Sequence, residues 1–176
     1  MTILLTERTI VDRISEEDAP FFVELVNTPG WLRFIGDRQV SDVDDALKYL
    51  RNGFLRSYRD HGFSYYLVRR ELDQKAMGVC GFLKKPELQN PDFGFAFLPQ
   101  HVNQGYAHEA CWAVLEYGVT TFGFEVLDAV TVPDNVRSIR LLEKLGFQRE
   151  GTLKEASTKE TLVLFRWSTA TNQPPP

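Results

Sequence analysis

The chain has 176 residues, of which 43% are hydrophobic and 25% are charged, and its formal net charge at pH 7 is −4. This composition is typical of one soluble globular domain with a substantial core. Acidic and basic residues are interspersed without a basic stripe, which argues against nonspecific nucleic-acid binding through phosphate neutralisation.

The N-terminal residues and the two cysteines indicate neither export nor a metal site. Glu7 and Arg8 come too early for the apolar stretch of a signal peptide. No run approaches the roughly 18 continuous apolar residues of a membrane span. Cys80 and Cys111 match no zinc spacing, and no histidine cluster accompanies them. We therefore expect a cytoplasmic protein with reduced thiols, no metal, and no membrane or nucleic-acid partner.

The first half of the chain predicts a strand, two helices and two further strands. Residues 4–14 form the first strand, and Ser15 opens a helix with Asp18 three residues on, close to a capping box. This helix ends near residues 27–30. A second helix starts at Ser41 and stops at 61–63, and one apolar stripe runs along it: Val43, Ala46, Leu47, Leu50 and Phe54. Strands at 63–70 and 76–84 follow, joined by a polar turn.

The second half alternates strands with helices and closes with a hairpin. A strand at 93–98 leads through a polar loop into a helix with a clean apolar stripe. A strand at 126–132 and a helix at 135–145 follow, and Gly146 ends that helix as a C-terminal cap. Residues 147–156 and 160–168 form the final hairpin. Because a helix connects the strands at 93–98 and 126–132, we expect these two strands to be parallel.

This order predicts an α/β (α+β) fold, in which helices flank a mixed, mostly antiparallel central sheet of about six to seven strands. We expect residues 1–168 to form a single domain. Residues 169–176 end in three consecutive prolines and are expected to form a flexible proline-rich tail.

The loop "LPQHVNQGYAHEA" (98–110) joins a strand to a helix in a way that suits a phosphate. The first N–H groups of a helix have no internal partner and carry the positive end of its dipole. Gly105 and Ala107 leave these groups open to a ligand, and Asn103 tolerates a left-handed conformation. Taken alone the pattern is weak, since a glycine before a helix is usually only a turn.

A second stretch, "TVPDNVRSIRLLEKLGF" (131–147), also places polar residues at a helix start after a strand. Asn135 and Ser138 are three residues apart and share one helix face, above the apolar row that continues to Leu145. They can point into the interior of the domain. The alternative is structural: Asp134 or Asn135 caps the helix and Ser138 bonds the nearby backbone. The two interpretations do not exclude each other.

These motifs together resemble the GNAT superfamily of N-acetyltransferases, in particular the branch that includes ribosomal-protein N-terminal acetyltransferases. "VNQGYA" (102–107) occupies the family's Q/R-x-x-G-x-G/A loop, and Asn135, Ser138, "EKLGF" and "REG" match its second signature. The opening "LTERTIVDRISEEDA" (5–19) is also similar to that branch, so the resemblance covers about residues 4–167. It implies the family's fold and direct acetyl transfer from acetyl-CoA to an amine.

The resemblance also implies where the coenzyme lies. The pantetheine arm would insert between the strands at 93–98 and 126–132, and the pyrophosphate would meet main-chain N–H groups of the loop. It assigns acetyl-CoA binding to Phe97, Leu98, Asn103, Gln104, Gly105, Tyr106, Ala107, His108, Asn135 and Ser138.

For catalysis, the resemblance implies Asp92 as the base, acting through a water, and Ser138 as the donor to the departing thiolate. Leu142 occupies the position where many family members have a Tyr for that second task. Asp92 could equally belong to the turn "NPD" for local reasons. Trp31 and Phe34 would border the acceptor pocket by resemblance, although aromatics in such positions commonly anchor helices to a sheet.

The expected function is thus an acetyl-CoA-dependent N-acetyltransferase whose acceptor is a small-molecule amine or a protein N-terminus, in a monomer or homodimer. The alternative is a module that binds acetyl-CoA as a sensor without transferring the acetyl group. A nucleotide-binding or kinase-like protein is poorly supported, because neither G-x-x-x-x-G-K-[ST] nor a G-x-G-x-x-G after a strand occurs. A serine hydrolase would need G-x-S-x-G, which is also absent from the sequence.

Overall fold

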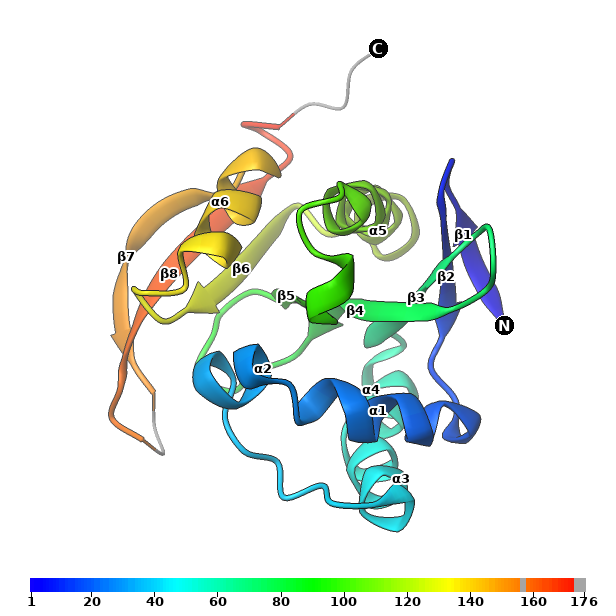
Figure 1. Ribbon diagram of the computed structural model, residues 1–176. Coiled ribbons are helices and arrows are strands. Elements are labelled where there is room, and N and C mark those ends of the chain that lie inside the picture. The colour runs from blue at the N-terminus through cyan, green and yellow to red at the C-terminus, as the bar shows by residue number, and fades with distance from the viewer. Residues whose placement is uncertain (156–157, 173–176) are drawn as a thin grey trace.

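A mixed sheet of eight strands forms the framework of the computed structural model, which describes residues 1–155 and 158–172 (Figure 1). The strands are β1 (Thr2–Leu5), β2 (Thr9–Arg13), β3 (Tyr65–Arg70), β4 (Ala76–Leu83), β5 (Asp92–Phe97), β6 (Val126–Thr131), β7 (Gln148–Lys154) and β8 (Thr161–Ser168). Their order is β1-β2-β3-β4-β5-β6-β8-β7. Only the β5–β6 pairing is parallel among the pairings of the described strands. The predicted mixed, mostly antiparallel sheet and its parallel pair are confirmed.

The sheet has more strands than the predicted six to seven, because residues 4–14 do not form one strand. They belong to a hairpin of β1 and β2 whose turn is closed by Thr6 and Thr9. The Thr6 amide donates to the Thr9 carbonyl at 2.9 Å, and the Thr9 amide donates to the Thr6 hydroxyl at 3.0 Å. These bonds reverse the chain and carry Glu7 and Arg8 at the tip of the turn.

Helices cover both faces of the sheet. They are α1 (Ala19–Val26), α2 (Pro29–Phe34), α3 (Val43–Asn52), α4 (Phe54–His61), α5 (Tyr106–Phe122) and α6 (Val136–Lys144), with short 3₁₀ turns η1 (Glu16–Asp18) and η2 (Pro99–His101). Figure 1 shows α1 to α4 on one face, and α5 and α6 on the other. The sheet therefore lies between two helical layers.

The first predicted helix ends near residue 27 as expected and is followed by a further short helix, whereas the second predicted helix is divided. The capping box is present: the Ser15 amide donates to Asp18 Oδ2 at 2.8 Å. The chain then runs through η1 and α1, and Thr28 caps a separate α2. The predicted helix at 41–61 is divided at Gly53, whose backbone (φ −103°, ψ −98°) is not helical. A Cβ at this position would lie 2.9 Å from the Tyr49 carbonyl oxygen, so the break suits glycine.

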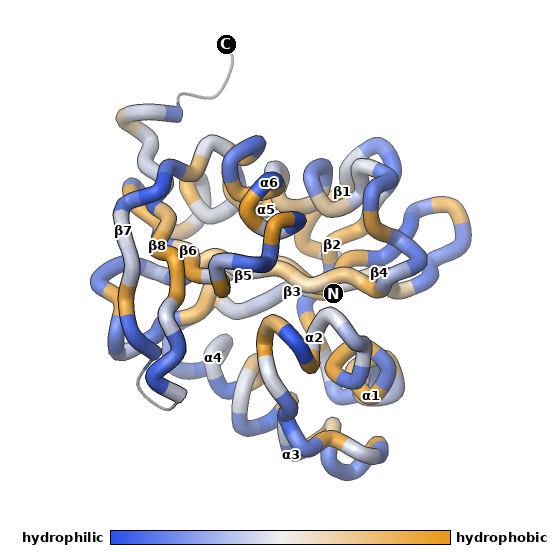
Figure 2. The backbone as a smooth tube through the Cα atoms, turned by 60° about the vertical axis from the view of Figure 1, so that its left-hand side comes forward, coloured by the Kyte–Doolittle hydropathy of each residue, from blue (hydrophilic) through white to orange (hydrophobic). Residues whose placement is uncertain are grey.

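The core lies on both faces of the central strands, which carry mostly apolar residues (Figure 2). On one face, α5 approaches β4 closely, because a Cβ at Gly118 would lie 2.5 Å from the Phe82 ring. Cys80 and Cys111 face the same layer, and both are buried free thiols, as predicted. This contact fixes the distance between α5 and β4 at Gly118.

The parallel strands β5 and β6 separate along their length. Their register is the single position Asp92↔Asp128, whereas β5 pairs with β4 continuously from Asp92 to Phe97. From Gly94 to Phe97 the residues of β5 are half-buried. The sheet therefore opens between β5 and β6 toward their carboxyl ends, where the loop before α5 begins.

The C-terminal end of the described chain lies against the start of β7. The Asn172 side-chain amide donates to the Gly146 carbonyl at 3.1 Å. Residue 156 of the predicted hairpin and residues 173–176 of the predicted tail lie outside the described residues. Within residues 1–155 and 158–172, no helix is long and apolar enough to cross a membrane.

Candidate active site

The loop between β5 and α5 has the conformation that its sequence predicts. Asn103 (φ 59°) and Gly105 (φ 85°) are both left-handed. Gly105 is the N-cap of α5, and no side chain in the described part of the chain caps this helix. The first N–H groups of a 17-residue helix are therefore free of side-chain partners, at the point where β5 and β6 have separated. This arrangement can bind an anion such as a pyrophosphate.

The start of α6 stands on the other side of the opening and is capped. Asn135 is the N-cap, and its Oδ1 accepts a hydrogen bond from the Ser138 amide at 3.4 Å. The predicted capping role is confirmed for Asn135, while both side chains stay half-buried. Leu142, one turn further on, is 2% exposed and belongs to the core, so it presents no proton donor to the opening.

Asp92 stands at the closed end of the opening and is almost completely buried, with 2% exposure. Its Oδ2 lies 2.8 Å from Lys85 Nζ, whereas Oδ1 has no hydrogen-bond partner among the described residues. Burial raises the pKa of Asp92 to about 6, although the Lys85 ammonium opposes the rise. Asp92 is therefore the first residue of β5, and its carboxylate forms an ion pair with Lys85. The local turn role considered for "NPD" is wrong.

Tyr65 approaches β5 from the face that carries α1 to α4. A Cβ at Gly94 would overlap the Tyr65 hydroxyl, so this hydroxyl lies over the β5 backbone two residues from Asp92, on the same face. The Tyr65 ring stacks on Phe54 of α4 with centroids 5.3 Å apart. Burial raises the pKa of Tyr65 well above its usual range, and the charge of Asp92 adds to this rise. Tyr65 thus stays a neutral hydroxyl that can donate and accept hydrogen bonds.

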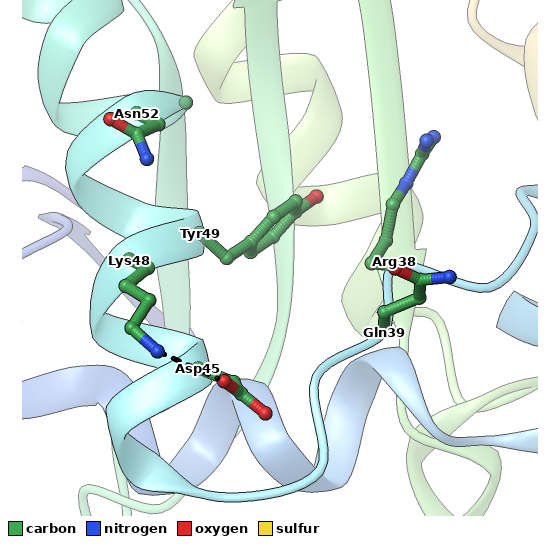
Figure 3. Close-up of a pocket in the computed structure, with 7 residues that line it drawn as sticks. Arg38, Gln39, Asp45, Lys48, Tyr49 and Asn52 are labelled. Carbon is green, nitrogen blue, oxygen red and sulfur yellow. Dashed lines mark hydrogen bonds and ion pairs between the residues drawn. The ribbon is translucent and has the colours of Figure 1, made fainter.

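A pocket of about 430 Å³ opens near these aromatic rings, between α3 and the preceding loop (Figure 3). It is lined by Arg38, Gln39, Asp45, Lys48, Tyr49, Asn52 and Gly53. Tyr49 points from α3 toward the loop that carries Arg38, and its ring lies 5.5 Å from that of Phe54. A series of rings, Tyr49, Phe54 and Tyr65, therefore leads from this pocket to β5 at Gly94.

Trp31 and Phe34 of α2 differ in their surroundings. Trp31 is 4% exposed and packs into the hydrophobic core, in agreement with the anchoring interpretation. Its indole N–H has no hydrogen-bond partner among the described residues. Phe34 is half-buried under the Arg33 guanidinium, and Arg33 pairs with Asp134 at 2.8 Å. This pair links α2 to the turn before α6, across the opening between β5 and β6.

Sequence reasoning missed four residues that the fold brings to the site: Arg8, Tyr65, Lys85 and Glu109. Arg8 and Glu109 form an ion pair beside the loop that precedes α5, and Lys85 forms an ion pair with Asp92. Arg8 and Glu109 lie within the segments 5–19 and 98–110, but nothing in either segment indicates that the two side chains meet. Tyr65 and Lys85 belong to no motif, and their positions become evident only in the folded chain. As for metals, the described residues contain no group of three or more His, Cys, Asp or Glu that could hold an ion.

The comparisons with known proteins agree with this geometry. Residues 8–148 match the model of the acetyltransferase (GNAT) domain. The uncharacterized N-acetyltransferase YnaD of Bacillus subtilis is 38% identical over 156 residues, which cover 89% of this chain and 88% of that protein.

Solved structures share the fold at low identity. A putative GNAT-family acetyltransferase from Bordetella pertussis superposes with a TM-score of 0.79 at 20% identity, covering 96% of this chain and 100% of the other. RimL, a ribosomal L7/L12 alpha-N-protein acetyltransferase, gives 0.82 at 14% identity, with coverages of 96% and 94%. Since the family model matches most of the chain, the protein belongs to the GNAT acetyltransferase family.

Proposed function

We propose that this acetyltransferase transfers the acetyl group of acetyl-CoA directly to a primary amine, either a small molecule or a protein N-terminus. The observation that carries the proposal is the uncapped start of α5, preceded by the left-handed residues Asn103 and Gly105, at the open end of β5 and β6. The free N–H groups at the start of this long helix can bind a pyrophosphate mainly through the backbone, because the small residues around them let the ligand come close.

The coenzyme would lie along this opening. The residues proposed to contact it are Phe97 and Leu98 at the end of β5, the loop and helix-start residues Asn103, Gln104, Gly105, Tyr106, Ala107 and His108, and Asn135 and Ser138 of α6. Beyond Asp92, no residue of β5 pairs with β6 among the described strands, so main-chain groups of β5 lack ladder partners on that side. Such groups can bind the amide-containing pantetheine arm.

The transfer needs a base for the amine and a donor for the thiolate. The amine nitrogen bonds to the acetyl carbon, the C–S bond breaks, the amine proton leaves and the thiolate gains a proton. We propose Asp92 as the base, acting through water. Its buried, unpartnered Oδ1 and its pKa of about 6 support this role. Ser138 is proposed to donate a hydrogen bond to the thiolate, since Leu142 cannot.

The acceptor is proposed to approach from the face of α1 to α4, where Tyr65 and Gly94 flank the base. Trp31 and Phe34 would border its path. RimL, named for ribosomal L7/L12, and SpeG of Vibrio cholerae, named for spermidine, share the fold at 14% and 15% identity. Identities this low do not select an acceptor. The sequence resemblance supports the branch of ribosomal-protein N-terminal acetyltransferases. We propose that residues 1–168 form a single domain. We further propose that the protein acts in the cytoplasm as a monomer or homodimer.

Calorimetric titration with acetyl-CoA tests the proposal. Wild type should bind, and Gly105→Trp should not, because a side chain at φ 85° strains the loop and its Cβ would lie 2.9 Å from Arg8 Nη2, which contacts the loop. Gly62→Trp is the matched control, since Gly62 has φ 82°, ends α4 and lies outside the proposed site. A screen of amines for release of free coenzyme A thiol then separates transfer from binding alone. If wild type does not bind acetyl-CoA, the proposal fails.

A further inference from the structure

We infer that Arg8 is a positioning residue for coenzyme binding: it holds the 103–107 loop and neutralises Glu109 at the start of α5. The inference rests on the proposed function, because it assumes that the loop binds the phosphates of acetyl-CoA. Arg8 lies at the tip of the β1–β2 hairpin, 101 positions from Glu109 in the sequence. It reaches the loop from outside the opening between β5 and β6.

Glu109 is held by a set of donors from this hairpin. Its Oε1 accepts from the Arg8 amide at 2.7 Å and from the Thr6 hydroxyl at 2.6 Å. Its Oε2 accepts from Arg8 Nε at 2.7 Å. Partial burial would raise the pKa of Glu109, but these hydrogen bonds outweigh it and lower the pKa, so the carboxylate is ionised at neutral pH. The carboxylate is thereby drawn toward the hairpin.

The same guanidinium also contacts consecutive residues of the loop. Arg8 Nη1 donates to the Gln104 carbonyl at 3.0 Å, and the Arg8 Cζ lies 4.8 Å from the centre of the Tyr106 ring. Between them, a Cβ at Gly105 would lie 2.9 Å from Arg8 Nη2. Arg8 thus fixes the orientation of the Gln104 carbonyl. This carbonyl must point away from a bound anion if the N–H groups at the start of α5 are to face the anion.

The electrostatic reason for this arrangement lies in the position of Glu109. A carboxylate in the first turn of a helix interacts favourably with the helix dipole, and it competes there with a bound phosphate. An unpaired Glu109 would also repel the polyanionic coenzyme. The Arg8 guanidinium cancels that charge, and its planar shape lets Nε serve the carboxylate while Nη1 serves the loop. A lysine could keep the charge but not both contacts.

The experiment compares acetyl-CoA binding by wild type, Arg8→Ala, Arg8→Lys and Arg8→Ala/Glu109→Gln, measured by calorimetry at low ionic strength. Arg8→Ala should raise Kd about tenfold, in line with the loss of charge-assisted hydrogen bonds. Arg8→Lys should give an intermediate Kd. The double variant should bind more tightly than Arg8→Ala, because it no longer carries an uncompensated carboxylate. A purely structural loss would not be relieved by the second substitution.

Arg51→Ala is the matched control. Arg51 forms a two-pronged pair with Glu16, with both distances 2.7 Å, between α3 and η1, away from the loop. Its loss should leave the Kd for acetyl-CoA unchanged. The inference is overturned if Arg8→Ala binds like wild type, or if the double variant binds no better than Arg8→Ala. If Arg8→Ala does not fold, as judged by thermal unfolding, the comparison of Arg8→Lys with wild type decides. Failure of wild type to bind contradicts the proposed function instead.

Discussion

The hydroxyl of Tyr65 occupies the space in which a side chain at Gly94 would begin. Gly94 lies on β5 between Asp92 and Ala96, on the face that carries α1 to α4, and Tyr65 comes from β3. The ring of Tyr65 cannot retreat freely, because it stacks on Phe54 at 5.3 Å. Glycine at 94 therefore lets a neutral hydroxyl stand beside the proposed base, on the side from which the acceptor would approach.

Gly94→Ala should destabilise the protein by about 1–3 kcal/mol, the usual cost of overpacking a well-filled site. Tyr65→Phe in the same chain should recover part of this loss, because it removes the overlapping oxygen but leaves ring carbon Cζ at 2.8 Å from the new Cβ. Urea unfolding of the four variants in this cycle measures the coupling. Strictly additive losses would show that the two positions do not meet.

The pKa of Asp92 predicts how the reaction depends on pH. A base acts in its ionised form, and the pKa of about 6 means that this form is lost as the pH falls below 6. With any accepted amine, the ratio of wild-type to Asp92→Asn kcat/KM should fall about tenfold per pH unit below this point. Asp92→Asn should lower the rate by about 10² or more and flatten this part of the profile. Because wild type and variant use the same amine, the ionisation of the substrate cancels in their ratio.

Lys85→Met supplies the companion test. The Lys85 ammonium, 2.8 Å from Asp92, favours the ionised carboxylate, so its removal should raise the pKa of Asp92. The inflection in the pH profile should then move to higher pH. An inflection that stays in place in Lys85→Met, or one that survives in Asp92→Asn, would mean that another group titrates.

The packing of α5 on β4 gives a prediction about the helix that follows the proposed phosphate-binding loop. Gly118→Ala should destabilise the fold by about 1–3 kcal/mol, because the new Cβ would stand 2.5 Å from the Phe82 ring and 3.1 Å from that of Phe124. Gly151→Ala is the control, since nothing lies within 4 Å of a Cβ there. Thermal unfolding of both variants checks the difference. If the two variants were equally stable, α5 would be able to move away from β4 without loss of stability.

The spacing of hydrophobic residues was sufficient to predict most of the helices and strands. It failed where a helix or strand is interrupted but the hydrophobic spacing continues. The stripe from Val43 to Phe54 continues across Gly53, so the sequence reads as one helix although the backbone at Gly53 is not helical. Residues 4–14 likewise read as one strand. The Thr6–Thr9 turn that divides them depends on hydrogen bonds, which leave no trace in the apolar pattern.

The candidate site was predictable where local sequence sets local structure. Asn103, Gly105 and Asn135 have the backbone or capping roles that their residue types favour. Contacts such as Arg8 with Glu109, or Tyr65 with Gly94, depend on how the hairpin and the sheet assemble. A single sequence gives no sign of which distant residues will meet, so these partners become visible only in three dimensions.

Asn135 can be tested for a ligand role separately from its capping role. Asn135→Ala should cost about 1 kcal/mol of stability, because the Ser138 amide loses its acceptor. Asn135→Asp should keep that stability, since an aspartate caps equally well and favours the helix dipole. Its negative charge at the opening should nevertheless weaken acetyl-CoA binding. Calorimetric titration and thermal unfolding of both variants separate the effects. If Asn135→Asp bound acetyl-CoA as tightly as wild type, Asn135 would be a helix cap only, and the coenzyme would lie away from the start of α6.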